Sequence, residues 1–260
     1  MFNHQLAGFA IAVAMLCGMI TDGAADPLNP STEGFVDNFK SLEQSDWYVA
    51  KYTATHPWFD VDWLPDAVTI EKGLNLALAP TPAGPKGFSA GSLRRHLPTG
   101  YGRYEVVMQP AKGEGVITGF FTYTGPYYGT RHDEIDIEFL GKDTTQIHVA
   151  TFVDGDLTNK FIDLGFDAAD RPRRYAFEWR PDSVRWFVGD KLIHEMTSAD
   201  GTVPKFPGML FANIWAADPK ISNWSGTIKP GIAGTSRVSC ISFAPLRGGE
   251  IAKPITQCTE

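Results

Sequence analysis

Apolar and polar residues alternate at two-residue intervals in several stretches of the chain, which is the pattern of half-buried β-strands. The clearest stretch lies within residues 131–143, where three carboxylates alternate with three apolar residues. In order, these residues are Glu134, Ile135, Asp136, Ile137, Glu138 and Phe139. The pattern predicts a strand that turns its apolar side chains into a core and presents all three carboxylates on the opposite face.

The remaining pattern predicts further short strands before and after this acidic strand. By residue number they are 74–78, 101–108, 116–123, 147–153, 184–188 and 191–194. The segment 147–153 is expected to pair beside the acidic strand, and the last two form a hairpin with a Gly189-Asp190 turn. The 26 Gly and 18 Pro separate these short segments, as in an all-β sandwich.

Three carboxylates on one strand face repel each other, and like charges at this spacing raise the pKa of at least one of them. Glycoside hydrolysis uses such a set, because one carboxylate acts as nucleophile and a second, held protonated, acts as general acid and then as general base. Asp136, between the two glutamates, would hold and tune that proton. The alternative is an ordinary amphipathic strand whose solvent face is acidic.

Geometry adds a condition to this interpretation. Alpha carbons four residues apart on a flat strand are roughly 13 Å apart, whereas a retaining glycosidase needs its carboxyl groups about 5 Å apart. We therefore expect the acidic strand to lie on a curved, concave sheet on which the side chains converge.

The segment from Asp133 to Asp143, DEIDIEFLGKD, resembles the active-site strand of glycoside hydrolase family 16, in particular its lichenase branch, the bacterial endo-β-1,3-1,4-glucanases. The likeness covers roughly residues 35–243. It also includes the segments 100–105, 120–126, 164–168, 175–179 and 213–215. The resemblance implies that Glu134 is the nucleophile, Glu138 the acid/base and Asp136 the assisting acid. The expected fold is a curved two-sheet jelly-roll sandwich, concanavalin A-like, with an open substrate cleft on the concave sheet.

Candidate sugar contacts come from two sources. Phe59 and Trp63 flank Asp60 and Asp62, a mixture that suits stacking on sugar rings and bonding to their hydroxyls, although such aromatics also pack in cores. The resemblance adds polar and aromatic residues at matching positions or in the acidic segment: Tyr123, Asn213, Trp215, Trp224, Arg94 and His132. Arg94 is expected to bond Asp136 or the substrate, with a surface ion pair as the alternative.

The chain departs from the lichenase pattern at several positions that hold sugar in that family. These positions are Ser92, His132, Ala150, Thr151 and Phe152. We therefore predict reshaped subsites, modest activity on barley-type β-glucan, and better activity on a bacterial exopolysaccharide whose acidic substituents meet His132 and Arg94 or Arg95.

The two ends of the chain carry separate signals. Residues 1–25 resemble a cleaved secretory signal peptide, because 6–20 is an apolar run of fifteen residues, short for a membrane span. Residues 26–34 form a leader, 35–245 the glycoside hydrolase domain, and 246–260 a C-terminal tail. Cys240 and Cys258 are the only cysteines after the signal, and in an exported protein they predict a disulfide that tethers this tail. The expected location is secreted or periplasmic, without membrane attachment after signal cleavage.

Charge and motifs exclude other classes. The net charge of −7 becomes −6 when the single Asp22 of the signal is removed, and without a Lys/Arg cluster the chain is a poor nucleic-acid binder. It has no set of His, Cys and carboxylate residues at zinc-ligand spacing. We expect a monomer whose partner is a polysaccharide and which requires no cofactor, with a structural calcium left open by the sequence. The alternatives to hydrolysis are a transglycosylase of the same family and a non-catalytic carbohydrate-binding module.

Overall fold

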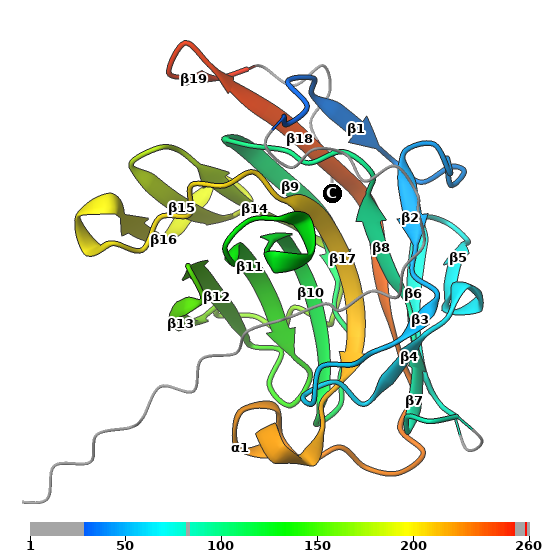
Figure 1. Ribbon diagram of the computed structural model, residues 1–260. Coiled ribbons are helices and arrows are strands. Elements are labelled where there is room, and N and C mark those ends of the chain that lie inside the picture. Colours follow the sequence, from blue (N-terminus) through cyan, green and yellow to red (C-terminus); the bar gives the residue numbers. More distant parts are fainter. Residues whose placement is uncertain (1–28, 82–83, 253–257, 259–260) are drawn as a thin grey trace, which may run out of the picture.

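A computed structural model describes residues 29–81, 84–252 and 258. The predicted signal peptide therefore lies outside the described residues. The regular secondary structure of the described chain is almost entirely β, arranged as two large sheets packed face to face (Figure 1). Within these residues, no helix combines the length and the apolar character that crossing a membrane requires.

The first sheet has seven antiparallel strands and carries the acidic segment near its middle. In spatial order its strands are β13 (Asp156–Asp163), β12 (Gln146–Val153), β11 (Asp133–Leu140), β10 (Val116–Thr124), β17 (Met209–Ala216), β8 (Ser92–Arg95) and β2 (Trp47–Val49). The strands β10 and β17 are long and visibly bent in Figure 1. This is the curvature that three converging carboxylates require.

The second sheet has twelve strands and supports the first. Its main path is β16 (Lys191–Thr197), β15 (Ser183–Val188), β14 (Arg173–Trp179), β9 (Gly102–Gln109), β18 (Gly234–Arg247), β6 (Leu74–Pro80), β7 (Phe88–Ala90), β4 (Val61–Trp63) and β3 (Tyr52–Thr53). Three short strands join it at the side: β1 (Phe35–Asp37), β5 (Val68–Ile70) and β19 (Glu250–Ile251). The helical turns are η1 (Pro65–Ala67), η2 (Pro126–Tyr128), η3 (Ser198–Asp200), η4 (Pro219–Ile221) and α1 (Ser222–Ser225).

Alternation along β11 decides which side chains enter the core. Ile135, Ile137 and Phe139 are fully buried between the sheets, as their period-two spacing predicts. The second sheet also reaches β11 directly, because the buried Trp186 donates from Nε1 to the backbone oxygen of Asp136 at 2.9 Å. The predicted hairpin that carries Trp186 is thus scaffold on the far sheet, and it fixes the backbone of the acidic strand.

A buried carboxylate at the start of β11 joins this strand to distant loops. Asp133 accepts hydrogen bonds from the backbone N–H groups of Asp154, Lys205 and Phe206 at 3.1, 2.7 and 3.2 Å. It also pairs with Arg131 at 2.9 Å. The first carboxylate of the DEIDIE segment is therefore structural, whereas the next three face the other side of the sheet.

The predicted disulfide between Cys240 and Cys258 is present, with alpha carbons 5.6 Å apart. It ties residue 258 to β18 and, with Val107, forms a small apolar cluster. The sandwich continues past residue 245, because β18 runs to Arg247 and β19 pairs with it. The first part of the predicted tail is thus sheet, and the disulfide anchors Cys258.

Candidate active site

The cross-strand register of the seven-stranded sheet aligns side chains in rows on its concave face. The Glu138 row reads Phe161, His148, Glu138, Gly119, Asn213 and Ser92 from β13 to β8. The Asp136 row reads Asn159, Ala150, Asp136, Phe121, Phe211 and Arg94. The Glu134 row reads Leu157, Phe152, Glu134, Tyr123 and Met209. Neighbouring rows are two residues apart, so each brings one carboxylate to the same face.

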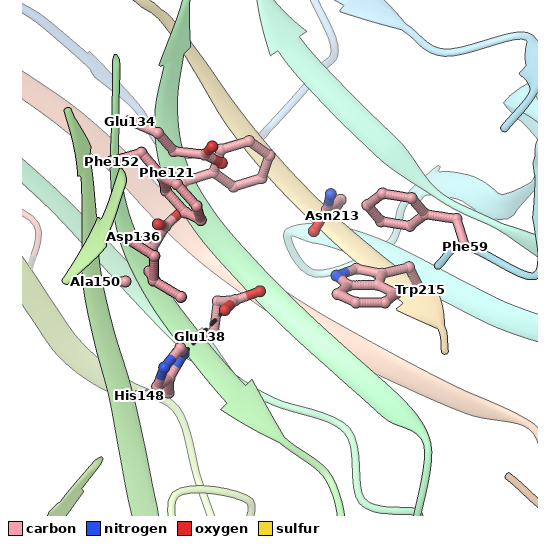
Figure 2. Close-up of a pocket in the computed structure, with 11 residues that line it drawn as sticks. Phe59, Phe121, Glu134, Asp136, Glu138, His148, Ala150, Phe152, Asn213 and Trp215 are labelled. Carbon is pink, nitrogen blue, oxygen red and sulfur yellow. Dashed lines mark hydrogen bonds and ion pairs between the residues drawn. The ribbon is translucent and has the colours of Figure 1, made fainter. Parts of the chain in front are cut away.

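All three carboxylates line one pocket, which Figure 2 shows on the concave face. The other lining residues are Phe59, Phe121, His148, Ala150, Phe152, Leu157, Asn213 and Trp215. Phe59 and Trp215 form an aromatic pair across the pocket from β11, with ring centroids 4.4 Å apart. The predicted convergence of Glu134, Asp136 and Glu138 is therefore found in the structure.

Glu134 is the deeper of the two glutamates, being 2% exposed. Its Oε2 lies 2.6 Å from Nε2 of His132, and the side chain of Asp136 hydrogen-bonds to its carboxylate. Burial and the charge of Glu138 raise the pKa of Glu134 well above its ordinary value, while the hydrogen bond from Asp136 opposes this rise.

Asp136 keeps its proton between the two glutamates. Burial, followed by the charges of Glu134 and Glu138, raises the pKa of Asp136 well above that of an ordinary aspartate. A protonated carboxyl group has an O–H to donate, and Glu134 is its acceptor. The middle acid of the strand therefore stores a proton and stabilises the charge of its neighbour.

His132 belongs to the same cluster, a contact that the sequence did not predict. Burial lowers the pKa of His132 to about 4, against the opposing effect of Asp133. The ring is thus neutral near pH 7 and stacks on Phe152 with centroids 4.6 Å apart. Because an ionised carboxylate only accepts hydrogen bonds, Nε2–H of His132 donates to ionised Glu134. His132 therefore contacts the carboxylate of Glu134, and it is not among the residues that line the pocket.

Glu138 lies nearer the mouth of the pocket, with 17% of its side chain exposed. Its Oε2 is 3.0 Å from Nδ1 of His148, while Gly119 stands beside it on β10. A β-carbon on Gly119 would approach Oδ1 of Asn213 to 2.8 Å. The glycine therefore leaves open space between Glu138 and Asn213.

The predicted sugar contacts separate into two groups. Phe59, Asn213 and Trp215 line the pocket, and Trp224 stacks against Trp215 with centroids 6.0 Å apart. Trp63 is 1% exposed and lies behind Phe59, so it supports the pocket wall from the core instead of facing sugar.

Tyr123 and Arg94 lie outside the lining of this pocket. Tyr123 stands beside Glu134 in the sheet and packs against His132 with centroids 5.2 Å apart. Arg94 donates to the hydroxyl of Tyr128 at 3.2 Å and lies over the ring of Tyr48. No bond from Arg94 to Asp136 is found among the described residues, because Phe121 and Phe211 separate the two in their row.

The substituted positions on β12 do not all face the pocket. Ala150 and Phe152 line it, whereas Thr151 points into the core and contacts Met196. Ser92 is buried at the β8 end of the Glu138 row. The reshaping predicted for the subsites therefore concerns Ala150 and Phe152, and it excludes Thr151.

The residue that sequence reasoning missed is His148. The sequence could have indicated this residue, because the predicted pairing of 147–153 beside the acidic strand brings one face of β12 into the cleft. Period-two alternation then puts 148, 150 and 152 on that face.

As for metals, the side chains in 29–81, 84–252 and 258 include no group of three His, Cys, Asp or Glu arranged to hold an ion.

A concave β-sheet that presents two glutamates and an aspartate from one of its middle strands to a single pocket, together with a matching family profile, defines the class of protein: a glycoside hydrolase. The sequence profile described as "Glycosyl hydrolases family 16" matches residues 55–231. The chain belongs to this family.

Relatives in sequence agree with the assignment. The chain is 37% identical over 213 residues to a protein named "Beta-glucanase" from Bacillus amyloliquefaciens, covering 82% of this chain and 86% of the relative. It is 38% identical over 194 residues to the "Beta-glucanase" of Bacillus subtilis (strain 168), covering 74% and 78%.

Solved structures agree as well. The Bacillus licheniformis β-glucanase superimposes with a TM-score of 0.76 at 34% identity, covering 81% of this chain and 97% of that one. A prokaryotic β-1,3-1,4-glucanase (lichenase) from a mouse hindgut metagenome gives 0.77 at 31% identity, covering 82% and 99%. The Crh5 transglycosylase, at 20% identity and a TM-score of 0.67, shares the fold.

Proposed function

We propose that the protein is a retaining endo-β-glucanase that cleaves internal bonds of a β-1,3-1,4-glucan or a related bacterial exopolysaccharide by double displacement. Glu134 attacks the anomeric carbon and forms a glycosyl ester, while Glu138 protonates the departing oxygen. Glu138 then removes a proton from the water that hydrolyses the ester. The observation that carries this proposal is the meeting of Glu134, Asp136 and Glu138 in one pocket.

The surroundings of Glu134 support its role as nucleophile. A buried carboxylate loses solvation, which weakens the ionised form. Protonated Asp136 and neutral His132 both donate to Glu134 and compensate for part of that loss. Neither donor adds a positive charge, so the carboxylate remains able to attack carbon.

The sheet supports an endo mode of attack. The rows extend from β11 across β12 and β13 on one side, and across β10, β17 and β8 on the other. A polysaccharide that crosses the strands along these rows has contacts on both sides of the cleavage point. Oδ1 of Asn213 is buried and has no hydrogen-bond partner in the described part of the chain. It is therefore available to a sugar hydroxyl beside Glu138.

The β-glucanases among the relatives support a β-glucan as substrate, and the substitutions on β12 favour a modified one. Ala150 and Phe152 present apolar surface where the lichenase pattern has polar groups. Since His132 is engaged with Glu134, we assign an acidic substituent to Arg94, which stands at the β8 end of the Asp136 row. Arg95 instead pairs with Asp46 and lies over the ring of Phe35.

We also propose an exported, monomeric enzyme, and the disulfide supports the oxidising location. The proposed function is tested by digesting mixed-linkage glucan, laminarin and acidic bacterial exopolysaccharides, and by recording the anomeric configuration of the first products by NMR. Retained configuration with mid-chain cleavage is expected. Inverted product would exclude Glu134 as nucleophile, and longer recombined oligosaccharides in place of hydrolysed ones would identify a transglycosylase.

A further inference from the structure

His148 is a buried histidine beside Glu138 with no assigned role. It stands directly opposite Glu138 in the β11–β12 ladder, with Nδ1 3.0 Å from Oε2 of Glu138. Its ring is held between Phe161, with centroids 4.5 Å apart, and Trp224, with centroids 5.6 Å apart. Burial and these two rings fix the orientation of the imidazole.

The second nitrogen of His148 indicates which tautomer is present. Nε2 is buried and has no hydrogen-bond partner among the residues that the structure describes. A buried N–H without an acceptor is more costly than an unused lone pair, so Nε2 carries the lone pair. The hydrogen therefore belongs on Nδ1, where Oε2 of Glu138 accepts it.

The other oxygen of Glu138 faces the substrate side. Figure 2 shows it pointing away from His148, toward the part of the pocket where Asn213 and Trp215 lie. The two oxygens are therefore not equivalent, since Oε2 is occupied by an imidazole N–H and Oε1 is open to the pocket.

We infer that His148 is a positioning residue that donates Nδ1–H to Oε2 of Glu138 and thereby confines the catalytic proton to Oε1. The inference deepens the proposed function and rests on it, because it requires Glu138 to be the acid/base. In the first step the proton leaves Oε1 for the departing glycosidic oxygen. In the second step Oε1 takes a proton from the attacking water. The Nδ1–H···Oε2 bond persists through both steps, so Glu138 need not turn between them.

The groups that face Glu138 are few. Its own strand contributes Glu134 and Asp136, and β12 contributes His148, against which the non-titrating Trp224 of α1 packs. β10 and β17 contribute Gly119 and Asn213, which do not titrate either. Among these neighbours, His148 is the N–H donor recorded at hydrogen-bond distance from Glu138.

The test replaces His148 by leucine and by glutamine. For His148→Leu we expect kcat on the polysaccharide to fall about ten- to hundredfold with KM little changed, which is part of the 10²- to 10⁴-fold effect of a general acid. Losing a donor to the ionised form should move the alkaline limb of the kcat/KM profile up by about one pH unit. His148→Gln retains an N–H donor and should restore both values most of the way.

Two further comparisons separate positioning from loss of folding. On an aryl β-oligosaccharide with a dinitrophenyl leaving group, which departs without a proton, kcat/KM of His148→Leu should match the wild type. Phe161→Ala, which leaves the imidazole in place but removes one of its clamps, should shift the profile in the same direction by less. His96→Leu makes the same change at a half-buried histidine outside the pocket, bonded to the backbone of Gln44, and should change neither value.

An alkaline limb identical to wild type in folded His148→Leu would overturn the inference, as would an equal loss on both kinds of substrate. If His148→Leu does not fold, the alkaline limbs of Phe161→Ala and His148→Gln test the inference in its place. A small upward shift for Phe161→Ala and a limb near that of the wild type for His148→Gln are then expected. Glu138→Gln, measured in parallel, keeps the two proposals apart. A fully active Glu138→Gln variant would contradict the proposed function. A deficient Glu138→Gln variant beside a normal His148→Leu variant would contradict the His148 inference alone.

Discussion

The two ends of the acidic strand present the same pair of groups, a glutamate beside an imidazole, in different surroundings. Glu134 is enclosed and receives hydrogen bonds from His132 and Asp136, whereas Glu138 is partly exposed and hydrogen-bonds to His148. The difference matches two chemical tasks. A nucleophile has to be aimed and kept from water, while an acid/base has to exchange protons with a leaving group and with water.

Replacing Glu134 by glutamine should have the largest effect. The amide keeps the shape but forms no glycosyl ester, so we expect kcat on polysaccharide to fall by at least about 10⁴-fold, as for other removed nucleophiles. Circular dichroism and melting temperature should show an intact fold. Activity close to wild type would mean that the enclosed end of the strand is not where bond formation occurs.

Replacing Glu138 by glutamine should distinguish the two ends. Loss of the general acid should lower kcat/KM on polysaccharide by about 10²- to 10⁴-fold. On a dinitrophenyl oligosaccharide kcat/KM should change little, because this leaving group needs no proton. The same pair of substrates applied to Glu134→Gln should show equal losses. A uniform loss in both variants would contradict the division of roles.

His132→Phe tests the imidazole at the enclosed end. Phenylalanine preserves the stacking on Phe152 but removes the donor to Glu134, and a hydrogen bond to a charged group is worth about 1.5–3 kcal/mol. We therefore expect kcat to fall by about ten- to hundredfold. Steady-state kinetics with His96→Phe as the matched control measures this, and an unchanged kcat would show that Asp136 alone sustains Glu134.

The same variant has a consequence for stability. The folded-state pKa of His132, about 4, lies below its ordinary value, so the unfolded chain binds this proton more readily. The stability contribution is present above pH 6.5 and is lost as the pH falls toward 4. Melting temperatures measured from pH 7 to 4 should fall more steeply for the wild type than for His132→Phe.

Asp136→Asn should give the smallest effect on stability, and one of opposite sign. Because the folded-state pKa of Asp136 is raised, its contribution is favourable below the ordinary aspartate value and is lost as the pH rises. Asparagine removes this cost at pH 7, and we expect a gain in unfolding free energy of about 0.5–2 kcal/mol together with lower activity. Denaturant titration at pH 7 would contradict the buried, proton-holding role if the variant were less stable.

Sequence periodicity predicted the elements that alternate strongly. The acidic strand, the Leu74–Leu78 strand and the hairpin at Gly189 are all present. The disulfide, which the cysteine count predicted, is present as well. Alternation within one strand sets the face of each side chain, which is why the three carboxylates were placed together correctly.

Contacts between strands were harder to predict. The partner of Arg94 depends on the register of β8, β17 and β10, and register is not encoded within any one strand. The burial of Trp63 behind Phe59 depends on how two loop-connected segments pack. His132 precedes β11 and so lies outside its alternating pattern, and nothing in that pattern indicated that the ring would contact Glu134. The missed contact of His148 required face and register together.

Asp133 links the assembly of the site to the order in which the chain is made. Its carboxylate collects backbone N–H groups from residues 21, 72 and 73 positions further along the sequence. Closing such long loops has an entropic cost that is recovered only when the distant partners have arrived. During synthesis from the N-terminus, β11 therefore cannot be locked until residues 205 and 206 have left the ribosome, and β17, which carries Asn213 and Trp215, follows directly. The active site should consequently form late and in a single step, after most of the sandwich has been translated.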